Sequence, residues 1–145
     1  DLEWWIGHED MAYGLNMGIS AGLWDDEDAA LRFAFRCMAG GGRYGFAQRE
    51  GVFEVWTGAL LRLNHIHARL GSIDGERTLL PDGRGVLWRR ADGSTLLFAF
   101  SSFEWPVPET TGIMEVGPDG METVTRTGHS LAARPWTVYR IAPGA

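Results

Sequence analysis

The chain contains no lysine, and each of its thirteen basic residues is an arginine. Its nineteen acidic residues leave a formal net charge of −6 at pH 7. A surface that follows a phosphate backbone needs clustered positive charge. The shortage of positive charge therefore argues against nucleic acid as a partner.

Cysteine is nearly absent too, because Cys37 is the only one in the chain. No internal disulfide can form, and the cysteine content does not indicate whether the protein works in a reducing or an oxidising compartment. Cys37 falls within a helical apolar pattern, which favours a small buried side chain over a nucleophile. Long apolar runs are also missing: charges or glycines interrupt each run before the ~20 residues that a membrane helix needs. We therefore expect no membrane span.

The residues that are present indicate a packed globular protein, since 45% are hydrophobic and 22% are charged. The chain begins at Asp1 without an initiator methionine and enters an apolar run at once. We therefore expect the rest of a parent chain upstream of this sequence.

Residues 1–71 alternate between strand-like and helix-like patterns. The apolar run at residues 2–6 predicts a buried strand, and residues 8–23 fit either a loop or an irregular helix. Asp25 and Asp26 favour the start of a buried helix, which the Gly40–Gly42 run ends. A short strand at 44–47 and an amphipathic helix at 52–70 follow, with Gly71 as the C-cap. This order predicts an α/β layer with parallel strands.

After residue 71 the pattern becomes strand-like and turns become frequent. Asp-Gly pairs at residues 82–83, 92–93 and 119–120 separate β-rich runs and predict antiparallel hairpins. We therefore expect two domains, residues 1–71 and residues 72–145, with the boundary at residues 72–76. The expected strands are residues 77–80, 86–90, 95–101, 113–116, 122–127 and 137–141.

Candidate catalytic residues gather near the carboxyl end of the first expected strand, where α/β layers place their active sites. Glu3, Glu9 and Asp10 supply the carboxylates that acid/base cleavage of a glycosidic bond requires. Glu3 stands between Leu2 and two tryptophans, an apolar setting that favours the protonated carboxyl of a proton donor. The alternative for each residue is a solvated loop carboxylate.

Most candidate substrate-binding residues lie in the same region, and Arg49 follows the second expected strand. Aromatic rings stack on the apolar faces of sugars, so the tryptophans near the first strand fit a carbohydrate cleft. Core packing is the alternative, and it suits the remaining tryptophans better. The His8-Glu9-Asp10 triplet lacks a second histidine at metal-binding spacing, so we expect neither a metal nor an organic cofactor. The substrate-binding candidates are Trp4, Trp5, His8, Trp24 and Arg49.

Two stretches resemble parts of a known enzyme class. Residues 31–70, LRFAFRCMAGGGRYGFAQREGVFEVWTGALLRLNHIHARL, resemble the closing βα units of TIM-barrel glycoside hydrolases. Residues 85–141 resemble the small β-sandwich appended after that barrel, through the LLFAFSS run at 96–102 and the Leu-Ala-x-x-Pro-Trp-Thr-Val-Tyr run at 131–139.

This resemblance implies an α/β fold followed by an all-β fold: the closing βα units of a (β/α)8 barrel plus a small antiparallel β-sandwich. It further implies a fragment of a glycoside hydrolase that acts on a carbohydrate substrate through carboxylate acid/base chemistry. The alternatives are a non-catalytic carbohydrate-binding or structural β-sandwich module, and an interaction protein that binds no sugar.

Overall fold

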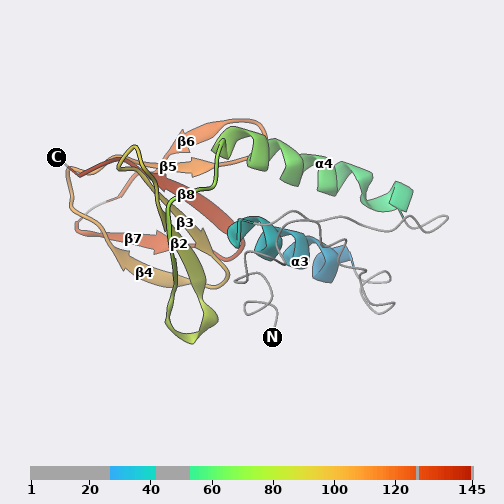
Figure 1. Ribbon diagram of the computed structural model, residues 1–145, viewed down its shortest axis with the longest axis horizontal. Coiled ribbons are helices and arrows are strands. Elements are labelled where there is room, and N and C mark those ends of the chain that lie inside the picture. Colours follow the sequence, from blue (N-terminus) through green and yellow to red (C-terminus); the bar gives the residue numbers. More distant parts are fainter. Residues whose placement is uncertain (1–26, 42–52, 127, 145) are drawn as a thin grey trace. The chain divides into compact units, whose positions relative to one another are not determined.

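The computed structural model describes residues 27–41, 53–126 and 128–144 of the chain (Figure 1). The chain divides into two compact units, residues 1–67 and residues 68–145, and each unit is considered by itself. Strands predicted at residues 2–6 and 44–47 lie outside the described residues.

The helix α3 (Glu27–Ala39) belongs to the first unit and is the buried helix that the sequence predicts. Glu27 and Asp28 lie in its first turn and Arg36 in its last turn, so both charge types complement the helix dipole. Gly41 has a φ of 79° and donates a backbone hydrogen bond to Met38, which ends the helix. Its buried side chains are Ala34, Phe35, Cys37, Met38 and Ala39.

The helix α4 (Phe53–Leu70) matches the second predicted helix. Gly71 follows with a φ of 68°, a left-handed conformation that glycine adopts without steric cost, and so caps the helix as expected. The last turn of α4 belongs to the second unit, where Leu70 is buried. Arg69 donates hydrogen bonds to the backbone oxygens of Gly117 (3.2 Å) and Pro118 (3.0 Å). This last turn is therefore tied to the rest of the second unit.

The predicted fold class, with closing βα units of a (β/α)8 barrel, is wrong. Within residues 27–41, 53–126 and 128–144, every strand pair is antiparallel, and no βα unit is evident. The described chain is mostly a small antiparallel β-sheet domain with two helices. An apolar helix face requires a covering surface but does not specify a parallel strand as that surface, which is why the helix pattern misled the prediction.

The β-sheet domain consists of two antiparallel sheets. The larger sheet has the strand order β1-β2-β3-β8-β5-β6, and β4 and β7 form a separate pair. Figure 1 shows β4 and β7 side by side. Asp-Gly turns join β1 to β2, β2 to β3 and β5 to β6, so the three predicted hairpins are present. The strands are β1 (Glu76–Leu79), β2 (Gly85–Arg89), β3 (Thr95–Ala99), β4 (Phe103–Pro106), β5 (Ile113–Val116), β6 (Met121–Thr123), β7 (Ser130–Ala133) and β8 (Thr137–Ile141).

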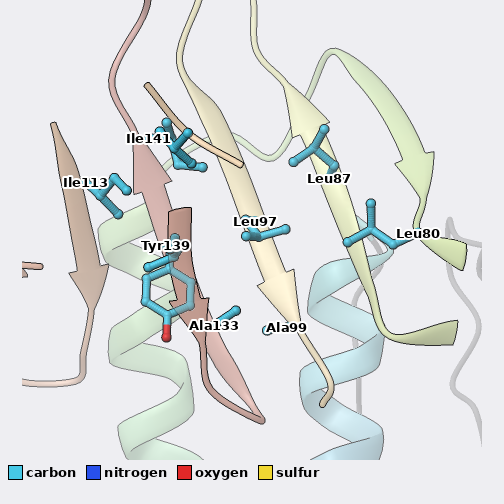
Figure 2. Close-up of a cluster of buried hydrophobic side chains, with 10 residues drawn as sticks. Leu80, Leu87, Leu97, Ala99, Ile113, Ala133, Tyr139 and Ile141 are labelled. Carbon is cyan, nitrogen blue, oxygen red and sulfur yellow. The ribbon is translucent and has the colours of Figure 1, made fainter. Parts of the chain in front are cut away.

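A continuous hydrophobic core joins the two sheets. In the larger sheet, Leu97 lies opposite Leu87 on one side and Tyr139 on the other, so these three side chains share one face. Figure 2 shows core side chains from neighbouring strands lying side by side. The smaller sheet contributes Leu131 and Ala133, with Phe103 and Trp105 packed against them. The full cluster is Leu80, Leu87, Leu97, Ala99, Val107, Ile113, Leu131, Ala133, Tyr139 and Ile141.

The strands β4 and β7 were not predicted from the sequence. The strand β4 ends in Pro106, and a proline within a run argues against a strand unless it lies at an edge. The strand β7 has the sequence SLAA, which lacks β-branched and aromatic residues. Pairing of Trp105 with Leu131 and of Phe103 with Ala133 stabilises both strands instead.

Candidate functional site

The predicted site residues all lie outside the described part of the chain. Their proposed roles in catalysis and substrate binding therefore stay predictions. They are Glu3, Trp4, Trp5, His8, Glu9, Asp10, Trp24 and Arg49.

Several charged side chains of the second unit hold turns or loops, and Asp92 is the first example. Its carboxylate accepts hydrogen bonds from the backbone N–H and the hydroxyl of Ser94, in the turn between β2 and β3. These bonds, the hydroxyl bond first, hold the pKa of Asp92 below its ordinary value. Arg140 lies 3.6 Å from the same carboxylate. Asp92 is therefore an ionised turn residue, unsuited to donate a proton at neutral pH.

The carboxylate of Glu115 has a similar structural role. Glu115 forms an ion pair with Arg134, and its cross-strand neighbour on β6 is Glu122. The backbone N–H of Arg134 donates a 3.0 Å hydrogen bond to the hydroxyl of the buried Tyr139. Arg134 thus connects the turn before β8 to both β5 and the core.

Arg126 holds the loop between β4 and β5. Its guanidinium donates hydrogen bonds to the backbone oxygens of Val107 (2.9 Å), Thr111 (2.7 Å) and Glu109 (3.3 Å), and also to that of Pro108. One planar cation thereby satisfies four carbonyl groups of a loop. The side chain replaces the ladder hydrogen bonds that this irregular segment lacks.

We expect Arg126→Ala to lower the free energy of unfolding by ~2–3 kcal/mol, because loop carbonyls lose charged donors. Urea denaturation followed by tryptophan fluorescence measures this change. Arg89→Ala is the matched control: Arg89 is exposed, and a surface arginine away from such contacts changes stability by ~0.5 kcal/mol or less. Equal losses for the two variants would show that Arg126 does not hold the loop.

Three tryptophan rings of the second unit take part in packing. Trp88 is buried beneath the guanidinium of Arg77, 5.9 Å from the ring centroid. Trp105 packs against the core cluster, and Trp136 stacks on Phe100 with ring centroids 5.7 Å apart. Each of these three rings therefore has a packing role in the second unit.

The described residues contain neither a cluster of metal-ligating side chains nor a helix that could span a membrane. These residues contain no group of three histidine, cysteine or acidic side chains placed to hold a metal ion. Neither described helix is long and apolar enough to span a bilayer.

Cys37 is a buried thiol, as its sequence pattern predicts, with 2% of its surface exposed. Desolvation by burial raises its pKa to about 12. With this pKa, roughly one Cys37 thiol in ten thousand is ionised at pH 8. The ionised thiolate is the form that reacts.

We therefore expect Cys37 to react at least ~100-fold more slowly with an aromatic disulfide reagent in the native chain than in 6 M guanidinium chloride. Release of the coloured thiolate measures both rates. Comparable rates in the two conditions would mean that the thiol is accessible and that α3 is not buried on this face.

Comparisons with known proteins give no relative. No protein-family model matches the chain, and neither a curated protein nor a solved structure matches it. The resemblance to glycoside hydrolases therefore depends on the sequence stretches quoted above.

The arginines that organise the second unit were not predicted from the sequence. Arg126 bonds to groups 15 to 19 residues away, and Arg134 bonds to Glu115, 19 residues away. No local pattern marks such partners, because tertiary structure alone brings them together. The frequent turns between the expected strands were the one available signal that loops need side-chain hydrogen bonds to their backbone.

Proposed function

We propose that the chain is part of a glycoside hydrolase in which residues 68–145 form a non-catalytic structural β domain. In this proposal the acid/base chemistry belongs to Glu3, Glu9 and Asp10 of the first unit. The likeness of two stretches of the β domain to the appended domains of these enzymes supports the enzyme class. One stretch includes most of β3, and the other includes most of β7 and of β8.

We assign a non-catalytic role to the second unit because its described carboxylates are exposed or paired with an arginine. Among the described residues of this unit, every aspartate and glutamate except Glu115 is exposed, and Glu115 is half-buried and paired with Arg134. A glycosidase requires two carboxyl groups with contrasting environments, one of them kept protonated by apolar surroundings. The described carboxylates of the β domain do not provide that contrast.

The structural role also agrees with the way polar groups are used in this domain. Asp92, Arg126 and Arg134 each hold a turn or a loop, and the described tryptophans pack against neighbouring side chains. These observations favour a structural module over a sugar-binding module, because the polar groups and tryptophan rings that the structure describes there already have a structural role.

Hydrolysis of a panel of nitrophenyl glycosides by the full chain tests this proposal. We expect Glu3→Gln to lower kcat by ~100-fold or more, since it removes a proton donor. The matched variant Glu122→Gln, on an exposed carboxylate of β6, is expected to keep kcat within ~2-fold.

Two results would contradict the proposal in different ways. A loss of kcat in Glu122→Gln as large as that in Glu3→Gln would show that the β domain takes part in catalysis. Absence of hydrolysis across the whole panel would argue against the enzyme class itself.

A further inference from the structure

Arg84 is a half-buried arginine whose position is fixed by its backbone. It follows the 3-10 turn η2 (Pro81–Gly83), and its N–H donates to the backbone oxygen of Pro81. Its own backbone oxygen accepts a 2.8 Å hydrogen bond from the N–H of Phe100, just beyond β3. The residue is therefore held between the β1–β2 hairpin and the end of β3.

The guanidinium of Arg84 lies over an aromatic ring. Its central carbon is 5.0 Å from the ring centroid of Phe103, the first residue of β4. Phe103 in turn packs against the hydrophobic core, so the ring is a firm support. A planar cation stacked in this way loses little rotational freedom when it binds a ligand.

The positive charge of Arg84 has no anionic partner among the described residues. Its Nε atom is shielded from water and has no hydrogen-bond acceptor. In contrast, Arg126 donates to loop carbonyls and Arg134 pairs with Glu115. A partly desolvated cation without a counter-charge is energetically costly, and an oxyanion bound to it recovers part of that cost.

Two serine hydroxyl groups lie in the turn between β3 and β4. Ser101 and Ser102 are exposed, and they lie between Phe100 and Phe103, the two residues that Arg84 contacts. Serine hydroxyls donate hydrogen bonds to oxyanions, and they commonly accompany arginine in the binding of carboxylates and phosphates.

We propose that Arg84 and the Ser101–Ser102 turn bind an oxyanion, the carboxylate or phosphate group of a ligand. The terminal nitrogens of Arg84 donate to the anion, because Nε is shielded. The ring of Phe103 supports the guanidinium, and the serine hydroxyls donate to the remaining oxygen lone pairs. This site is independent of the proposed glycosidase chemistry.

NMR titration of the isotopically labelled full chain tests the site, with the side-chain Nε–H signal of Arg84 as the probe. The ligands are sodium glucuronate, inorganic phosphate and neutral glucose, at constant ionic strength and pH. We expect a saturable shift with an apparent Kd of ~1–10 mM for an anion and no saturation with glucose. Saturation by glucuronate alone identifies an acidic sugar, whereas saturation by phosphate as well identifies a general oxyanion site.

Matched variants separate this site from nonspecific charge effects. We expect Arg84→Gln to weaken anion binding at least tenfold. The backbone amide signals of residues 100–103 measure this change. Arg84→Lys should weaken it as well, because lysine keeps the charge but loses the stacked planar group. Arg89→Gln removes an exposed arginine and should leave the Kd within twofold. A shift that does not saturate, or equal binding by the Arg84→Lys variant and the unmodified chain, would overturn the proposal.

Discussion

Replacement of Leu97 by alanine is expected to lower the free energy of unfolding of the β domain by ~3–4 kcal/mol. Leu97 is fully buried at the centre of the core, between Leu87 and Tyr139 (Figure 2). Truncation removes buried methyl groups and leaves a cavity between two paired strands that cannot collapse freely. Urea denaturation of the full chain, followed by circular dichroism of the strands, measures the loss.

Leu79→Ala is the matched control for this substitution. The same side chain is removed there, but Leu79 lies on the edge strand β1 and is 51% exposed. We expect a loss of ~1 kcal/mol or less, because little apolar surface returns to water. If both variants lost the same stability, Leu97 would not lie in the core as described.

Gly85→Ala is expected to produce the second large loss, ~2–3 kcal/mol, for a steric reason. A Cβ atom at Gly85 would lie 2.3 Å from the backbone oxygen of Phe98 and 3.3 Å from a methyl carbon of Leu80. The first contact involves the backbone of the neighbouring strand β3, so relief requires the two strands to separate. Thermal denaturation of the variant tests this expectation.

Gly120→Ala provides the comparison for Gly85→Ala. Gly120 lies beside the β5–β6 turn, where an added Cβ meets no other heavy atom within 4 Å. Its backbone conformation is open to alanine, so we expect a stability change within ~0.5 kcal/mol. Similar destabilisation by both alanines would mean that the close approach of β2 and β3 is not present.

Local patterns in the sequence predicted much of the secondary structure. The helices α3 and α4 were identified by apolar periodicity and by the glycines after them, which act within a few residues. Hairpins were identified by Asp-Gly pairs for the same reason. The strands β4 and β7 were missed, since their formation depends on pairing between residues 24 to 30 positions apart.

The wrong barrel prediction has a related cause. A helix with apolar residues on most faces must pack against other elements, but its sequence pattern does not specify which helix or strand packs against it. Similarly, the candidate residues Glu3, Glu9 and Asp10 were chosen from strand-end positions, and those positions lie outside the described residues. Arg84 and Arg126 had no sequence signal, because their contacts are set by tertiary structure.

The second unit is an antiparallel β domain whose strands pair around β3 and β8. Nuclear Overhauser contacts in the labelled full chain test this strand pairing. We predict cross-strand contacts that link Leu97 to Leu87 and Tyr139, and Tyr139 to Glu115. Contacts three residues apart along residues 95–99, as in a helix, or a parallel pattern between β3 and β8 would contradict the account.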